Sequence, residues 1–303
     1  MKSNFILIGI IFAFLWASAS TATKIGLQSA QPFVIAVSRF FIAGMIMLIA
    51  THFFLKKNLP PKNTWKQIMI YGLLNVSIYL GLYVIGMQKI SAGLGTLAVG
   101  MNPVLISFMG AFFFKQKVTG MGILSLLLCL LGIFIAAYPL LRTSYASIDG
   151  IVIIFISMMA YSGGAIYYSR TDWKGMDILT INGWQTVAGG IFLLPFLFFT
   201  YDPAKNIYDT HFWSGTIWLA IPVSIGAVQC WMILLKKDAV KAAYWLFLCP
   251  VFGFLLARIF LKEPLSLFTA AGVLLVVSGL YIAQRYKVSK KGAGMDNSIM
   301  DNG

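Results

Sequence analysis

Residues 92–114 read AGLGTLAVGMNPVLISFMGAFFF, an unbroken run without a charged side chain. A helix rises about 1.5 Å per residue, so a run of this length can cross the roughly 30 Å hydrocarbon core of a bilayer. Lipid offers no partner to an unpaired backbone group, and a single spanning segment is therefore helical. The stretch predicts a transmembrane helix with an amide, Asn102, and a proline, Pro103, at mid-depth.

Apolar runs of similar length recur along the chain, which is 59% hydrophobic and 11% charged over 303 residues. A soluble domain is about 45–50% apolar and about 25% charged, and its core stops growing near this length. The pattern predicts an all-α integral membrane protein of about ten transmembrane helices. We expect spans near residues 5–23, 33–54, 67–87, 91–114, 119–138, 149–169, 177–199, 214–235, 239–261 and 265–285.

The first span also has features of a cleaved signal peptide, since Lys2 precedes the apolar run and small residues follow at 17–20. The run continues to Thr23, which is long enough to span the bilayer. Cleavage would also remove one member of the internal repeat described below. We therefore favour an uncleaved first span.

Basic side chains between the spans set the orientation. With the N-terminus inside, 16 Lys and Arg residues lie on the inner side and 6 on the outer side, and only Arg39 lies well inside a span. The positive-inside rule then predicts a multi-pass protein of the inner or plasma membrane with both termini in the cytoplasm. These loop anchors account for the net charge of +14. No aromatic-interleaved basic patch indicates a nucleic-acid partner.

The opening stretch has a counterpart in the second half. Residues 92–136 align without gaps on residues 239–283 with ten identities, including Pro103 on Pro250. Each half then holds five spans, and because five is odd the second half is inverted in the membrane. Inverted repeats are typical of secondary transporters, which bind substrate near mid-depth between the halves. We expect two five-helix repeats, over residues 1–142 and 143–286. A disordered cytoplasmic tail is expected over residues 287–303.

Acidic residues are absent from the predicted bilayer centre, because all nine fall in loops, at span ends or in the tail. Proton- and sodium-driven carriers often keep a carboxylate there, so an acid-based proton relay is disfavoured. A facilitator, an exchanger or coupling through other groups stays open. His52 and His211 lie near span ends, and no convergent set of ligands or catalytic groups can be assembled. We expect no enzyme activity and no metal.

Arg39 has two interpretations. The guanidinium could face a cavity and pair with a substrate carboxylate or a helix end. It could equally extend along the helix to the outer interface, about 9 Å away at 1.5 Å per residue.

Pro103 and Pro250 lie in the middle of repeat-related spans. Proline removes one backbone hydrogen bond, and such breaks line cavities or act as hinges in transporters. The alternative is a tolerated kink, since proline is common in membrane helices. We favour the hinge because the two prolines are symmetrically placed.

Polar and aromatic side chains at depth predict the lining of a cavity. Tyr79 and Tyr83 are four residues apart and share one helix face. An aromatic and amide surface without an acid suits an amphipathic organic solute rather than a bare ion. For each residue alone, an interfacial belt or helix packing is the alternative. The predicted lining is Trp16, Arg39, Tyr79, Tyr83, Asn102, Tyr161, Gln185, Gln229, Tyr244 and Trp245.

Over residues 5–285 the chain resembles the EamA-type transporters of the drug/metabolite transporter superfamily. The run 261–265, LKEPL, follows the family pattern at the end of the second half. In the first half, the spacing from Trp16 to Lys24 and the arginine of the second span also match. The chain departs from the family at Gln116, where an acidic residue is usual.

The resemblance implies transport of amino acids, metabolites or drugs through a central cavity, with the bilayer and a small-molecule substrate as partners and no cofactor. We expect a secondary transporter that works by alternating access, with an exporter of amino acids or related metabolites as the first choice. One alternative is a membrane-embedded enzyme, which would need a convergent acid, base or metal set. Another is a non-transporting scaffold or sensor, which would need neither symmetric prolines nor a polar mid-depth. Substrate, direction, coupling ion and oligomeric state stay open.

Overall fold

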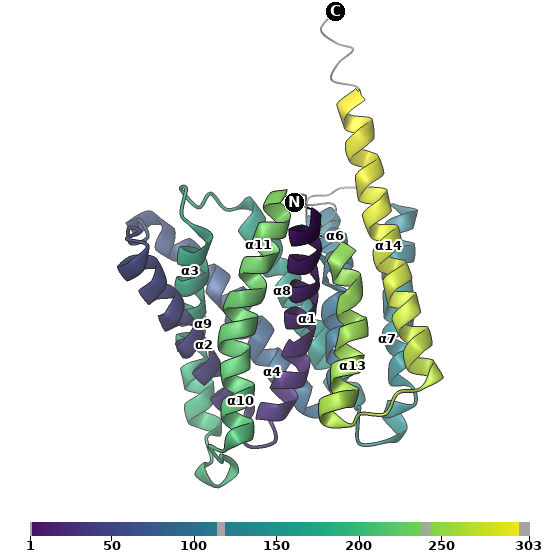
Figure 1. The fold of residues 1–303 in the computed structure, drawn as a ribbon, viewed down its shortest axis with the longest axis horizontal. Coiled ribbons are helices and arrows are strands. Elements are labelled where there is room, and N and C mark those ends of the chain that lie inside the picture. The colour runs from purple at the N-terminus through teal and green to yellow at the C-terminus, as the bar shows by residue number, and fades with distance from the viewer. Residues whose placement is uncertain (1, 114–118, 238–241, 243, 297–303) are drawn as a thin grey trace, which may run out of the picture.

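The computed structural model describes residues 2–113, 119–237, 242 and 244–296, and the elements it forms there are helices (Figure 1). The predicted all-α class is confirmed. The first half comprises α1 (Lys2–Gly26), α2 (Pro32–Leu48), η1 (Ile49–Phe54), η2 (Lys62–Thr64), α3 (Trp65–Gly72), η3 (Leu73–Ile78), α4 (Tyr79–Lys89), α5 (Ala92–Gly100), α6 (Asn102–Phe113) and α7 (Gly120–Ala137). After η4 (Leu140–Arg142), the second half comprises α8 (Ile148–Arg170), α9 (Ile178–Thr200), η5 (Pro203–Lys205), α10 (Thr210–Trp218), η6 (Leu219–Ala227), α11 (Val228–Lys237), η7 (Trp245–Phe247), α13 (Leu248–Leu261) and α14 (Leu267–Asp296).

The spans follow the predicted order. Within the described residues, eight helices are long and apolar enough to cross a membrane, and the bent pair α5–α6 makes a ninth. A shorter apolar helix, Trp245–Leu261, occupies the place of the remaining predicted span. The predicted start of that span, residue 239, lies outside the described residues.

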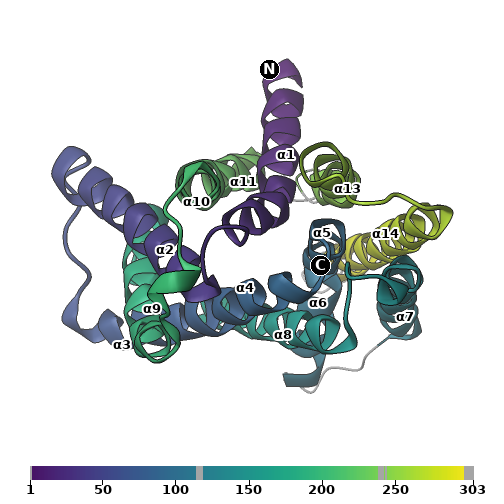
Figure 2. The same cartoon turned by 90° about the horizontal axis from the view of Figure 1, so that it is seen from below.

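The packing of the helices reflects the repeat. Where two spans share a large contact, the spans five places away from each of them are in contact as well. The largest contacts join α7 to α14 and α2 to α9, which are the fifth with the tenth span and the second with the seventh. The contact of α4 with α8 is mirrored by that of α1 with α10, η6 and α11. Figure 2 shows α1, α10, α11 and α13 on one side of the bundle and α4, α8 and α9 on the other.

The start of α1 and the end of α14 lie at the same end of the bundle, which we call the terminal end (Figure 1). The opposite, distal end holds the turn after α1 and the loop before α10. These two segments are hydrogen-bonded to each other, because Gln31 N donates to Asn206 Oδ1 at 2.9 Å and Ile207 N donates to Ser29 O at 2.7 Å. An even number of spans returns the chain to its starting side, as two inverted five-span units require.

The structure differs from the sequence prediction at the C-terminal tail. Helix α14 continues to Asp296, so the first part of the predicted disordered segment 287–303 is helical. The reason is local, because residues 285–291 include no proline and several good helix formers, and a helix can continue past the bilayer surface. Residues 297–303 lie outside the described part of the chain.

Both repeat-related prolines lie where a span is divided into two segments. Helices α5 and α6 meet at Met101 with a bend of 42°, and Pro103 is in the first turn of α6. Pro250 is in the first turn of α13, directly after the short helix η7. A proline costs little in a first turn, since its missing N–H would have no partner there. The break in the fourth span thus has a counterpart in the ninth.

Two π-helical segments lie in the third and eighth spans, which are also repeat-related. These are η3 and η6, and Pro222 lies inside η6. Segments of this kind are rare and are frequent at functional sites, because the wider turn changes which side chains face inward. Both contribute side chains to the central cavity described below.

Glycines allow the closest approach between the halves. A Cβ atom added at Gly132 of α7 would lie 2.6 Å from the carbonyl oxygen of Gly272 in α14. Membrane helices associate through such small residues, because lipid supplies no hydrophobic driving force between them. The α7–α14 pair therefore depends on these two positions.

We expect Gly132→Ala to destabilise the protein by about 1–3 kcal/mol, since the added methyl group overlaps backbone atoms that cannot move independently. Thermal unfolding in detergent, followed by the loss of monodisperse protein, measures this. The matched control is Gly163→Ala in α8, where an added Cβ meets no atom within 4 Å. Equal stability of the two variants would contradict the predicted close contact.

Candidate substrate-binding cavity

A polar cavity of about 110 Å³ lies between the two halves, and both contribute to its wall. A cavity needs roughly 10–15 Å³ on this measure to hold one water molecule, so this one has room for several waters or a small solute. Its walls come from α1, α2, η3, α4, α5, α8, α9, η6 and α11. The lining is Trp16, Ala19, Ser20, Arg39, Phe40, Asn75, Val76, Tyr79, Leu80, Tyr83, Thr96, Val99, Tyr161, Asn182, Gln185, Thr186, Val223, Ser224 and Val228.

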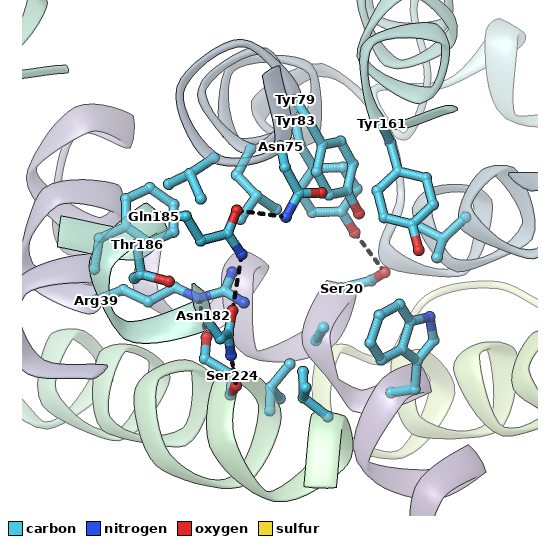
Figure 3. Close-up of a pocket in the computed structure, with 18 of the residues that line it drawn as sticks. Ser20, Arg39, Asn75, Tyr79, Tyr83, Tyr161, Asn182, Gln185, Thr186 and Ser224 are labelled. Atoms are coloured by element: carbon cyan, nitrogen blue, oxygen red, sulfur yellow. Dashed lines mark hydrogen bonds between the residues drawn. The ribbon is translucent and has the colours of Figure 1, made fainter. Parts of the chain in front are cut away.

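A chain of polar side chains runs along one side of the cavity (Figure 3). Arg39 Nε donates to Ser224 Oγ at 3.1 Å, and Asn182 Nδ2 lies 3.4 Å from the Ser224 carbonyl oxygen. Gln185 Nε2 donates to Asn182 Oδ1 at 2.8 Å. Asn75 Nδ2 donates to Gln185 Oε1 at 3.2 Å. The chain links spans of both halves, since Arg39 and Asn75 belong to the first and the other three to the second.

Aromatic rings form the other side. The Tyr79 and Tyr161 ring centroids are 4.8 Å apart, and those of Tyr79 and Tyr83 are 6.1 Å apart. The Tyr83 hydroxyl lies 2.7 Å from Ser20 Oγ, and both residues are buried. Figure 3 shows Ser20, Tyr83 and Tyr161 across the cavity from Arg39, Asn182 and Ser224. A ligand between these walls would meet a polar surface on one side and ring faces on the other.

Arg39 is buried in the cavity wall, with 6% of its surface exposed. Its Nε atom is held by Ser224, and its guanidinium carbon lies 5.6 Å from the Phe40 ring centroid. Among the described residues no carboxylate forms an ion pair with it. Placing a guanidinium in a membrane protein is costly, so an unpaired one that faces a cavity is a strong candidate for an anion ligand.

The described lining contains no aspartate or glutamate. No group of three or more His, Cys, Asp or Glu residues that could hold a metal ion occurs in the described part of the chain either. The acceptors available to a ligand are amide and hydroxyl oxygens. The arrangement therefore suits recognition of an anionic group more strongly than recognition of an isolated cation.

Six of the ten residues predicted to line the cavity belong to this wall: Trp16, Arg39, Tyr79, Tyr83, Tyr161 and Gln185. The other four lie elsewhere. Asn102 is buried at the α5–α6 junction with its Oδ1 atom unpartnered, and Gln229 is half-buried in α11. Tyr244 is 44% exposed, and Trp245 packs against Gly9 of α1. The helix is broken just before Asn102 and again around Tyr244 and Trp245. An unbroken helix would have directed these three side chains differently.

The predicted lining left out several polar residues of the wall: Ser20, Asn75, Thr96, Asn182, Thr186 and Ser224. Helical spacing could have found three of them. Ser20 follows Trp16 by four residues, Asn75 precedes Tyr79 by four, and Asn182 precedes Gln185 by three. No such signal marks Ser224, because it lies in a π-helical segment where the ordinary helical period does not apply.

The fold and the cavity together define a polytopic helical membrane protein with a ligand-sized polar space between two repeats. The EamA-like transporter family model matches the chain twice, over residues 3–138 and 148–284, and the chain belongs to this family. It is accordingly a multi-pass membrane transporter of the drug/metabolite transporter superfamily. The family resemblance seen in the sequence is confirmed.

Similar proteins span nearly the whole chain. An uncharacterized transporter of Archaeoglobus fulgidus is 29% identical over 89% of this chain and 95% of its own length. The uncharacterized transporter YvbV of Bacillus subtilis is 24% identical over 94% of both chains, and the protein PecM of Dickeya dadantii is 25% identical over 89% of both. A solved crystal structure shares the fold with a TM-score of 0.65 at 17% identity, over 93% of this chain and 98% of the other.

The Asn75–Gln185 hydrogen bond should couple the two halves measurably. In a double-mutant cycle with Asn75→Ala and Gln185→Ala, we expect a coupling free energy of about 0.6 kcal/mol and at most about 1.7 kcal/mol, the range known for side-chain hydrogen bonds in membrane proteins. Unfolding in mixed micelles measures it. Asn75→Ala with Thr200→Ala is the control pair and should be additive, because the Thr200 hydroxyl, the group that the substitution removes, donates to Phe196 O within its own helix. If the effects of Asn75→Ala and Gln185→Ala on the free energy of unfolding are additive, the Asn75–Gln185 hydrogen bond is contradicted.

Proposed function

We propose that the protein is a secondary transporter that moves a small organic solute bearing a carboxylate, with the carboxylate held by Arg39 in the central cavity. Export of amino acids or related metabolites is the activity we expect, by analogy with the family. The observation that carries the proposal is the buried guanidinium, which faces the cavity without an ion pair among the described residues.

The rest of the cavity supports an amphipathic body on the solute. Asn182 and Gln185 offer amide groups to an amino or hydroxyl substituent, and the rings of Tyr79 and Tyr161 offer an apolar face. A binding site that combines an apolar wall with a few placed polar groups is typical for small organic ligands. The cavity volume of about 110 Å³ favours a compact solute.

Alternating access is supported by the symmetry of the packing. The cavity lies between two repeats with equivalent contacts, and inverted repeats of this kind expose a central site to each side in turn by rocking against each other. Pro103 and Pro250, at the divisions of the fourth and ninth spans, are the hinge positions we propose. Because the described lining has no carboxylate, we further propose exchange or facilitated transport rather than an acid-based proton relay.

Replacement of Arg39 tests the proposal. We expect Arg39→Gln to reduce counterflow of the carboxylate solute at least 30-fold, since loss of one partner from a buried charged pair costs about 2 kcal/mol or more. Arg39→Lys should recover part of the activity, because it keeps the charge but not the planar fork. Counterflow in proteoliposomes measures the loss of transport. Amino acids and other carboxylates are each compared with their primary amide, which identifies the solutes whose carboxylate is recognised.

The matched control for this experiment is Arg142→Gln. Arg142 is exposed at the distal end, where it donates to the Tyr138 hydroxyl at 2.8 Å, so its loss removes the same charge without touching the cavity. Equal transport of acid and amide, or full activity in Arg39→Gln protein that remains folded in detergent, would overturn the carboxylate assignment.

We also propose that the terminal end faces the cytoplasm, which the bias of basic loop residues supports. In intact cells, the thiol of Lys205→Cys in the loop before α10 should react with a membrane-impermeant maleimide. The thiol of Lys57→Cys after η1 should react only after permeabilisation. The reverse pattern would place the termini outside.

A further inference from the structure

A second polar pocket opens at the distal end of the bundle, with a volume of about 410 Å³. We call it the distal pocket. It is lined by Lys24, Leu27, Gln28, Gln88, Ser144, Tyr145, Leu261 and Glu263. Gln28, Gln88 and Tyr145 are exposed, so this pocket is accessible from the distal surface.

The distal pocket continues the path of the central cavity along α1. Trp16, Ser20, Lys24 and Gln28 follow one another at intervals of four, so they share one side of the helix and of the turn that ends it. The first two line the central cavity and the last two line the distal pocket. A solute moving along this side of α1 would pass directly from one space to the other.

A buried hydrogen bond lies on the distal side of the central cavity. Ser20 Oγ and the Tyr83 hydroxyl are 2.7 Å apart, with 2% and 3% of each residue exposed. On α1 the pair lies between Trp16 and Lys24, and on α4 Tyr83 lies between Tyr79 of the central cavity and Gln88 of the distal pocket. The Ser20–Tyr83 bond, with the buried Met87 side chain one turn further along α4, therefore lies where a path between the two spaces would be narrowest.

Lys24 brings the distal pocket an available positive charge. It is half-buried, and among the described residues no carboxylate lies within ion-pair distance of it. Glu263 attracts it through space, but that carboxylate is engaged elsewhere: Oε1 accepts from Ala92 N at 2.6 Å and Oε2 from Gly93 N at 3.1 Å. The ammonium group can therefore still accept an anionic ligand.

We propose that the distal pocket is a second binding site for the transported solute, in which Lys24 takes up the carboxylate that Arg39 holds in the central cavity, on the other side of the Ser20–Tyr83 bond. This inference rests on the proposed function and specifies the route. Two cations in sequence along a narrow path lower the barrier for an anion at each step, because a charged group inside a membrane protein is costly unless it is paired. Gln28 and Gln88 supply additional donors beside Lys24.

The charge selectivity of the distal pocket can be tested without knowing the substrate. In protein whose three cysteines are replaced by alanine, the thiol of Gln28→Cys is reacted in detergent with an anionic sulfonatoethyl and a cationic trimethylammonioethyl methanethiosulfonate. We expect the anionic reagent to react faster, and Lys24→Met to lower the anionic-to-cationic rate ratio by about tenfold, as a unit charge at contact range implies. Lys24→Arg should restore the ratio.

Lys205→Met is the matched control, since it removes the same charge from the distal end in a loop where Lys205 pairs with Asp202. It should leave the rate ratio unchanged. An unchanged ratio in Lys24→Met, or an equal fall in Lys205→Met, would overturn the assignment of an anion site at Lys24.

Transport then separates this inference from the proposed function. With a carboxylate solute found by counterflow, Lys24→Met should raise the half-saturating concentration about tenfold for solute added at the distal side and leave the value for the terminal side unchanged. Loss of transport in Arg39→Gln with both values unchanged in Lys24→Met would refute the second site alone. Full transport in Arg39→Gln, with the labelling ratio still dependent on Lys24, would refute the proposed function and leave an anion site in the distal pocket.

Discussion

Hydrocarbon offers no hydrogen bonds, and this constraint explains most of what is irregular in the structure. Wherever a helix is broken or a polar group lies at depth, the protein itself has to supply the partner. Helix α5 begins at the distal end with its first turn buried in protein, and its first N–H groups are satisfied by the carboxylate of Glu263, which is 5% exposed. A carboxylate suits this place because the N-terminus of a helix carries a partial positive charge. The same contact fixes α5, from the first repeat, to the hairpin that joins α13 and α14 in the second.

The same constraint shapes the central cavity. Arg39 is charged and buried, and among the described residues it contacts the Ser224 hydroxyl and the face of the Phe40 ring and forms no ion pair. Asn182, Gln185 and Asn75 bond to one another in a chain, so the amides are largely satisfied by the protein. The guanidinium is the exception, because it has donors to spare while its neighbours are paired. Such a site suits a ligand of opposite charge. Because the pairs cross between the repeats, movement of one repeat against the other would also rearrange the wall that the solute contacts.

Sequence patterns predicted the architecture well because hydropathy and loop charge act through the bilayer, whose thickness is nearly constant. The spans from 33–54 to 177–199 and the last one, 265–285, agree with the helices to within a few residues. The site was predicted less completely, since each inward direction was extrapolated along an unbroken helix. Asn102 follows a 42° bend and Ser224 lies in a π-helical segment, and in both places the extrapolation fails. Tyr79 and Tyr83 lie in α4, where the period is regular, and both line the cavity.

The repeats are symmetric in packing but not in chemistry, and this difference makes the two ends of the proposed path unlike. The first span aligns on the sixth at a shift of 145 residues, which places Trp16 on Tyr161. Ser20 and Tyr83 are hydrogen-bonded on the distal side, whereas Ala165, the counterpart of Ser20 in this alignment, has no hydroxyl to form an equivalent bond. Lys24 corresponds to Ser169, so the positive charge beside the path is also present in only one half. A pair of repeats that rock against each other needs similar packing in both, but binding and release at the two ends need different groups. The equivalent helix contacts are therefore retained, while the polar side chains along α1 and α8 differ.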